Sequence, residues 1–160
     1  MEISRGVRRP VLAAAACTLA LAALLAAPAP AAAQAVRLTG LGGERLTDAD
    51  LAQGTTIFIV WASWSPKSRD IVERVNPIAS RWGGRARVVT VNFQEDRAAV
   101  EAFLAGKRLA VPTYLDRDGA FSKQYTVATL PGLLILKNGQ VAFRGALPDD
   151  PDGVISGTLP

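Results

Sequence analysis

Continuous apolar runs alternate with helical stripes of apolar residues through the middle of the chain. Residues 55–62 (TTIFIVWA) follow Gly54 as an unbroken β-branched and aromatic run, which predicts a central strand buried on both faces. From Pro66 onward the apolar positions recur at intervals of four, three and four residues, which predicts an amphipathic helix that ends at the glycine pair 83–84. The positions of this stripe are Ile71, Val75, Ile78 and Trp82.

A second strand and helix follow the first pair. Residues 86–93 are again apolar and β-branched, and residues 94–106 carry a helical stripe with Val100, Phe103 and Leu104 facing inward. The order strand, helix, strand, helix predicts two parallel strands joined by a right-handed crossover.

The rest of the pattern adds antiparallel strands. Residues 132–136 and 141–144 flank Asn138 and Gly139, and Asn before Gly is the strongest short-range hairpin signal. Shorter elements are expected at 38–51 (a strand, a turn and a helical turn capped by Thr47), at 111–116 (a strand) and at 121–125 (a helical turn). The predicted fold class is therefore α/β, a three-layer sandwich with a mixed central sheet.

The N-terminus has the organisation of a secretory signal peptide. Basic residues precede an almost uncharged apolar stretch, 11–27, and small residues ending in Ala33 and Ala35 form an AxA cleavage site. We expect cleavage after Ala35, which divides the chain into a signal peptide, 1–35, and one domain, 36–160. The protein would then be periplasmic or otherwise extracytoplasmic. The alternative is a retained membrane anchor, and the choice between the general and the twin-arginine export routes stays open.

Composition excludes several kinds of chemistry. The chain of 160 residues has no histidine and a single cysteine, Cys17, which lies in the leader. Histidine-dependent catalysis, thiolate or imidazole metal sites and intramolecular disulfides are therefore excluded, and we expect neither a metal nor another cofactor. Removal of residues 1–35 leaves 15 basic and 13 acidic residues, and the scattered Lys and Arg do not indicate a nucleic-acid partner.

Two segments carry a family resemblance. Residues 61–68 (WASWSPKS) resemble the active-site segment of exported thiol-disulfide oxidoreductases of the TlpA and ResA type, whose motif reads WASWCxxC. Residues 125–147 (YTVATLPGLLILKNGQVAFRGAL) are similar to the thioredoxin segment that holds a cis-proline, the following strand and a hairpin. The resemblance spans about residues 38–147 and implies a thioredoxin-like fold with a cis-proline loop.

The chain departs from the family motif at its reactive atoms. Ser65 and Ser68 stand at both cysteine positions. In the family the first cysteine attacks a substrate disulfide as a thiolate and the second resolves the mixed intermediate. A serine hydroxyl is a far weaker acid and forms no S–S bond, and Lys67 is poorly placed to act as its base. Exported relatives often lack the buried Asp of thioredoxins, and Ile59 stands at that position here.

Three interpretations of the serines follow. In the first, Ser65 caps the helix that begins with Pro66 and has no further role. In the second, Ser65 binds a ligand thiolate or carboxylate, which resembles the serine-type glutathione transferases of this fold superfamily. In the third, the protein is an ordinary oxidoreductase whose cysteines were replaced by serine.

The resemblance also implies a groove beside the motif. Pro131 aligns with the cis-proline of the family, which leaves the backbone of Leu130 free to pair with an extended peptide. Trp64 would form a flat apolar wall, whereas Trp61 and Trp82 are expected in the core. The candidate binding residues are Trp64, Ser65, Pro66, Lys67, Ser68, Leu130 and Pro131.

These observations favour a binding protein over an enzyme. We expect an exported, redox-inactive thioredoxin-like protein that binds an extended polypeptide of the cell envelope non-covalently, with a membrane contact only if the leader is retained. Thiol-disulfide oxidoreductase and glutathione binder or transferase remain the alternatives. Residues 149–160 replace the long C-terminal helix of the family, so one face of the sheet is expected to be less covered, as a partner contact or a frayed end.

Overall fold

The computed structural model describes residues 35–159. Of the predicted leader only Ala35 is among them, and Pro160 lies outside them. The described chain forms a sheet in the order β2-β1-β5-β4-β3-β6-β7. Its strands are β1 (Arg37–Gly40), β2 (Arg45–Thr47), β3 (Thr55–Trp61), β4 (Arg87–Phe93), β5 (Thr113–Asp116), β6 (Gly132–Lys137) and β7 (Gln140–Ala146). The helices are α1 (Asp48–Leu51), the 3-10 helix η1 (Pro66–Ser68), α2 (Ile71–Trp82), α3 (Arg97–Leu104), α4 (Ala120–Gln124) and α5 (Asp152–Thr158).

The mixed sheet predicted from the sequence is confirmed. β4 pairs in parallel with β3 and with β5, whereas β6 runs antiparallel to β3 and to β7. The β6–β7 turn has positive φ angles at Asn138 (50°) and Gly139 (77°), as the Asn-Gly pair predicts. β3 is buried from Thr56 to Trp61, in agreement with its unbroken apolar run.

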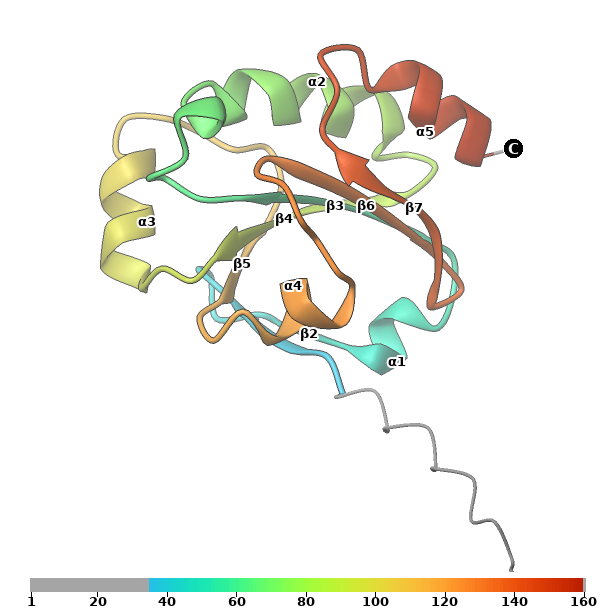
Figure 1. The fold of residues 1–160 in the computed structure, drawn as a ribbon, viewed down its shortest axis with the longest axis horizontal. Coiled ribbons are helices and arrows are strands. Elements are labelled where there is room, and N and C mark those ends of the chain that lie inside the picture. The colour runs from blue at the N-terminus through green and yellow to red at the C-terminus, as the bar shows by residue number, and fades with distance from the viewer. Residues whose placement is uncertain (1–34, 160) are drawn as a thin grey trace, which may run out of the picture. The chain divides into compact units, whose positions relative to one another are not determined.

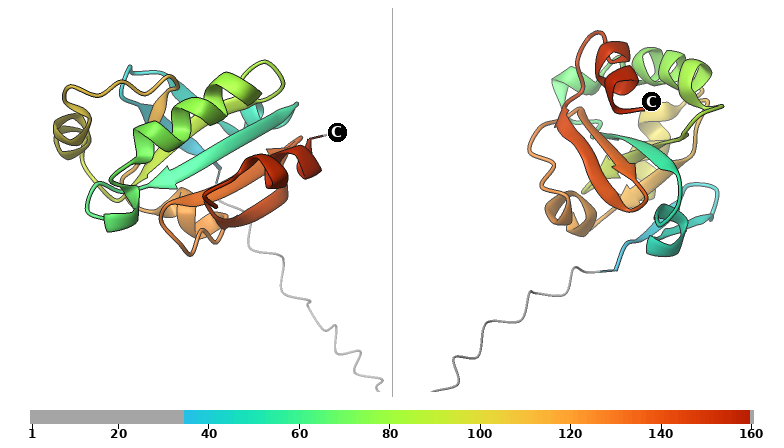
Figure 2. Two further views of the ribbon diagram at one scale, coloured as in Figure 1. Left: turned by 90° about the horizontal axis from the view of Figure 1, so that it is seen from above. Right: turned by 90° about the vertical axis from the view of Figure 1, so that its right-hand side faces the viewer.

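Helices cover both faces of the sheet and complete three layers (Figure 1). On one face, α2 and α5 lie side by side over the central strands, and α3 adds its buried Val100 to the same cluster (Figures 1 and 2). On the other face, α1 and α4 contribute Leu51 and Phe121 to a second cluster. Alternate residues of β3 feed the two clusters, Ile57 the first and Phe58 the second, because successive strand side chains point to opposite faces.

The helix expected from Pro66 is interrupted, which corrects its predicted start. Only Pro66–Ser68 coils at first, as a 3-10 turn in which the Ser68 amide donates to the Ser65 carbonyl over 2.9 Å. α2 begins at Ile71, after the non-helical Asp70. Within this tight turn the side chain of Ser68 is buried, whereas Pro66 and Lys67 are exposed. The expected stripe and the end of α2 at Gly83 are both confirmed.

The C-terminus covers the sheet more fully than predicted. α5 is short, but its Ile155 is fully buried in the same cluster as α2, and Leu159 is buried with it. The indole nitrogen of Trp82 in α2 donates to Asp152 over 2.8 Å. Arg81 also pairs with Asp152, and Arg85 donates to the Leu159 carbonyl over 3.4 Å. The expectation of a less covered face or a frayed end is therefore wrong, because buried side chains and several polar contacts together dock the short helix.

Candidate functional site

The segment after β3 brings the candidate residues to the surface. β3 ends at Trp61, whose side chain is fully buried, and the Ser65 amide then donates to the Ala62 carbonyl over 3.1 Å. This turn places Trp64 outward with 60% of its surface exposed, whereas Ser65 is only 6% exposed. Core positions for Trp61 and Trp82 and an exposed position for Trp64 are thus confirmed. Pro66 and Lys67 follow as exposed residues.

The proline loop lies against this segment. The Leu130–Pro131 peptide bond is cis, as the resemblance implies, and β6 begins directly after it. The Ser65 hydroxyl donates to the Leu130 carbonyl over 3.3 Å. Within residues 35–159 the amide of Leu130 has no hydrogen-bond partner. Two segments 65 residues apart in sequence therefore meet as predicted, and the Leu130 amide at the contact stays unpaired.

The capping interpretation of Ser65 is not supported by its contacts. Ser65 occupies the N-cap position of η1, yet its side chain makes no capping hydrogen bond. Its hydroxyl bonds the proline loop instead. In η1, Pro66 has no amide hydrogen and the Ser68 amide is bonded to the Ser65 carbonyl. The hydroxyl therefore acts as a donor to the proline loop and not as an acceptor for η1.

Ser68 lies in a different environment from Ser65. Its side chain is fully buried, and its hydroxyl has no hydrogen-bond partner in the described chain. A buried hydroxyl without a partner costs about 1–3 kcal/mol relative to a satisfied one. The position fits a group that does not require hydrogen bonds, such as the thiol of the family motif.

Glu95 accepts hydrogen bonds from the 61–68 segment, and the sequence analysis did not predict this role. Its carboxylate accepts hydrogen bonds from the Ser63 amide (2.7 Å), from the Ser63 hydroxyl and from the Asn92 side chain (2.7 Å). It follows β4, the parallel neighbour of β3. Polar residues just beyond the carboxyl ends of adjacent parallel strands gather at one edge of a sheet, which is the signal that could have found Glu95.

Two pockets flank Leu130. The first, of about 360 Å³, is here called the apolar pocket, and its lining includes Trp64, Ser65, Phe93, Ser122, Val127 and Leu130. The second, of about 580 Å³, is here called the basic pocket, and its lining includes Lys67, Arg69, Asp70, Arg74, Leu130 and Asp149. Pro66 and Pro131 also line the basic pocket. All candidate residues except Ser68, which is enclosed, border one of the two.

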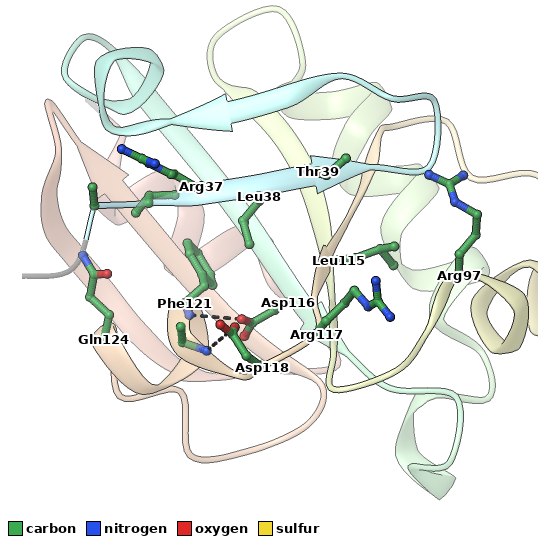
Figure 3. Close-up of a pocket in the computed structure, with 13 residues that line it drawn as sticks. Arg37, Leu38, Thr39, Arg97, Leu115, Asp116, Arg117, Asp118, Phe121 and Gln124 are labelled. Atoms are coloured by element: carbon green, nitrogen blue, oxygen red, sulfur yellow. Dashed lines mark hydrogen bonds between the residues drawn. The ribbon is translucent and has the colours of Figure 1, made fainter.

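A larger pocket of about 750 Å³ lies elsewhere, between β1 and α4 (Figure 3). No residue of the 61–68 segment or of the proline loop lines it. Its floor holds Asp116, whose carboxylate accepts from the Phe121 and Ser122 amides over 3.0 and 2.9 Å. Both carboxylate oxygens therefore bind the start of α4, which is a structural role.

The described residues give no sign of a metal centre or a membrane span. No group of three or more metal-ligating side chains occurs within residues 35–159. None of the helices there has the length and apolar character that a membrane crossing requires.

Comparison with known structures defines the class of the fold. The pneumococcal exposed lipoprotein thioredoxin from Streptococcus pneumoniae matches with a TM-score of 0.68 at 19% identity, over 78% of this chain and 97% of that one. StoA from Bacillus subtilis matches with a TM-score of 0.65 at 22% identity, over 81% and 99%. The fold is thioredoxin-like, as predicted.

Sequence comparison then gives the family. The family model described as Redoxin matches residues 26–157, and the chain belongs to the Redoxin family. Sporulation thiol-disulfide oxidoreductase A of Bacillus subtilis is 26% identical over 91 residues, which is 54% of this chain and 55% of that protein. The chain thus aligns with about half the length of this curated relative. The resemblance to thiol-disulfide oxidoreductases inferred from the two motifs is confirmed at this level.

Proposed function

We propose that this Redoxin-family protein is exported, has lost thiol–disulfide exchange, and binds an extended polypeptide non-covalently across Trp64, Ser65 and Pro131. The observation that carries the proposal is that the geometry of the family site is kept while its two reactive sulfur atoms are replaced by oxygen. Ser65 meets the Leu130 carbonyl beside the cis-proline, in the arrangement that the family resemblance implies, yet both cysteine positions hold serine.

Loss of redox chemistry follows from the atoms present. Thiol–disulfide exchange needs a sulfur nucleophile and a resolving thiol, and residues 35–159 contain no cysteine. A serine alkoxide would need a strong neighbouring base, and the chain has no histidine. The Ser65 hydroxyl hydrogen is directed at a carbonyl oxygen, which cannot act as that base.

Polypeptide binding is supported by the surface around Leu130. Its unpaired amide can donate to a carbonyl of an added extended chain, which is how peptide strands join exposed backbone edges. Trp64 offers a large exposed aromatic face beside this amide. Tryptophan is enriched among the residues that dominate binding energy at interfaces.

Export rests on the leader pattern and on a relative. The N-terminal residues have the basic, apolar and small-residue regions of a secretory signal. One structural neighbour is named an exposed lipoprotein thioredoxin. Together these features support an extracytoplasmic location.

Activity measurements test the redox part of the proposal. The unmodified protein is expected to show no dithiol-dependent reduction of a protein disulfide, because it lacks the two sulfurs. The double variant Ser65→Cys, Ser68→Cys is expected to reduce the same substrate, and each single variant is the matched control that cannot complete the cycle. Appreciable turnover by the unmodified protein would contradict the proposal, and it would show that another group carries the reaction.

Peptide binding tests the second part. Trp64→Ala is expected to weaken the binding of an extended peptide by about 2 kcal/mol, roughly 30-fold, because an exposed aromatic anchor is removed. Val141→Ala is the matched control, since Val141 on the β6–β7 hairpin is 46% exposed and lines neither pocket beside Leu130. Equal losses in the two variants, or no binding at all, would refute peptide recognition at this groove.

Glutathione addresses the alternative ligand. The glutathione-binder hypothesis predicts shifts of the Ser65 amide signal and of signals around Pro131 on titration with millimolar glutathione. We expect a flat titration, because the Ser65 hydroxyl is already bonded to Leu130. Saturable shifts at these positions would favour the thiol binder over the polypeptide binder.

A further inference from the structure

The two pockets beside Leu130 differ in chemistry. The apolar pocket is bordered by the aromatic residues Trp64 and Phe93 and by Val127. None of the residues described as lining it is charged. The basic pocket, whose lining also includes Leu130, gathers charged residues from η1, from α2 and from the segments that follow η1 and β7. A chain crossing at Leu130 would therefore meet a different surface on each side.

The basic pocket has unused positive charge. Arg74 is engaged, because it donates to the carbonyls of Leu147 (2.9 Å) and Pro148 (3.0 Å) and lies 3.6 Å from the carboxylate of Asp149. Lys67 and Arg69 are exposed and make no hydrogen bond or ion pair within the described chain.

Acidic residues offset only part of this charge. Asp149 is matched by Arg74, which leaves Asp70 as the remaining carboxylate that lines the pocket against two cations. The balance favours an occupant with a carboxylate. Exposed lysine and arginine side chains favour an occupant with a carboxylate over a neutral one only modestly. Other contacts supply the rest of the binding free energy.

The apolar pocket selects a side chain of the opposite kind. Its aromatic and aliphatic border favours an apolar side chain, because moving such a side chain from water into an apolar pocket is favourable. The hydroxyl groups among the described lining residues are those of the two serines, and Ser65 donates to Leu130 while the Ser122 hydroxyl is buried. The lining described by the structure therefore suits an apolar occupant.

Alternation along an extended chain connects the two pockets. Successive side chains of a strand point to opposite sides. A strand that pairs with the Leu130 amide therefore directs neighbouring residues toward opposite pockets. We infer that the groove selects extended polypeptide segments in which an apolar residue adjoins an acidic residue. This inference rests on the proposed function and adds the class of segment that the site prefers.

Charge-matched peptides test the preference. Short acetylated and amidated peptides with leucine–aspartate, leucine–asparagine or leucine–lysine at the centre differ in one side chain, and fluorescence anisotropy of a dye on each peptide reports its affinity. The aspartate peptide is expected to bind about fivefold more tightly than the asparagine peptide, with the lysine peptide weakest. The preference should shrink as salt is raised, since exposed charges are screened.

Variants assign the preference to the two cations. Lys67→Gln with Arg69→Gln is expected to abolish the difference between the aspartate and asparagine peptides. Arg117→Gln with Lys137→Gln removes the same charge from exposed residues that line neither pocket, and it is expected to keep the fivefold ratio.

The outcomes separate this inference from the function on which it rests. Equal binding of all three peptides, with loss on Trp64→Ala, would overturn the acidic preference and leave polypeptide binding intact. A preference that survives the Lys67 and Arg69 changes would also overturn it. Binding of no peptide would refute the proposed function and this inference together.

Discussion

Buried polar groups are treated differently at the β5–α4 turn and at the 61–68 segment. At the turn, Asp116 is 1% exposed, and its two carboxylate oxygens each accept a backbone amide of α4. Figure 3 shows the bond from Phe121. Four buried side-chain atoms of the described chain lack any partner, three of them in the 61–68 segment or at the end of β4 beside it and one in α4. They are the indole nitrogen of Trp61, the hydroxyl of Ser68, the amide oxygen of Asn92 and the hydroxyl of Ser122.

The location of these four atoms is informative. Trp61 and Asn92 are opposite each other at the ends of β3 and β4, Ser68 ends η1, and Ser122 lines the apolar pocket. Each unpaired buried group costs free energy, so such groups are rare in parts of a protein that serve only the fold. Three of the four thus lie at the end of the sheet that carries the 61–68 segment.

The largest effect on stability is expected from removal of the Asp116 carboxylate, whose two oxygens are both hydrogen-bonded. Asp116→Ala is expected to lower the free energy of unfolding by about 3 kcal/mol, because two buried amides lose their acceptor. Chemical denaturation measures the change. Asp118→Ala is the matched control, since exposed Asp118 accepts one amide, that of Ala120, over 3.0 Å. Equal losses in both variants would show that burial of the carboxylate contributes nothing special.

The Glu95 carboxylate connects the 61–68 segment to β4 through Ser63 and Asn92. Glu95→Gln is expected to cost about 1.5 kcal/mol of stability, because a neutral amide oxygen is a weaker acceptor for the Ser63 and Asn92 donors. It should also weaken peptide binding by loosening the turn that presents Trp64. Glu101→Gln on α3, whose carboxylate pairs with Arg97, is the control and should leave binding unchanged. Unchanged binding in Glu95→Gln would mean that the turn is held without this contact.

The sheet and its helices could be predicted because each has a local signal. The apolar run of β3, the stripe of α2 and the Asn-Gly turn before β7 appear in the sequence at the positions where the structure has them. The cis-proline and the exposed Trp64 followed from the family resemblance, and the structure contains both.

Long-range polar contacts could not be predicted. The bond from Ser65 to Leu130 joins residues 65 positions apart, and nothing local distinguishes it from the capping bond expected at the same serine. Glu95 reaches back 32 positions to Ser63. The docking of α5 depends on Ile155 and Asp152 finding α2, although Pro151 and Gly153 make the local pattern look like a frayed end.

Ser68 tests the effect of a buried hydroxyl that has no hydrogen-bond partner in the described chain. Ser68→Cys is expected to raise the free energy of unfolding by about 1 kcal/mol, because a thiol tolerates burial without a hydrogen bond better than a hydroxyl does. Measurements under reducing conditions prevent intermolecular disulfides. Ser68→Ala should gain less, since it leaves a small void in place of the hydroxyl. A less stable Ser68→Cys variant would indicate that the hydroxyl is satisfied, for example by a buried water, and would weaken the contrast between the two regions.

Ser65 should respond least, because its hydroxyl is intermediate between the two cases. Its bond to the Leu130 carbonyl, at 3.3 Å, is longer than the usual range for O–H···O contacts. Ser65→Ala is therefore expected to lower stability by only about 0.5 kcal/mol, measured by denaturation beside Ser68→Ala. Opposite signs for the two alanine variants would sharpen the comparison, since they change the same group in two environments. A loss above about 1.5 kcal/mol at Ser65 would show that this hydrogen bond is a main tie between the motif and the proline loop, and that the groove depends on it.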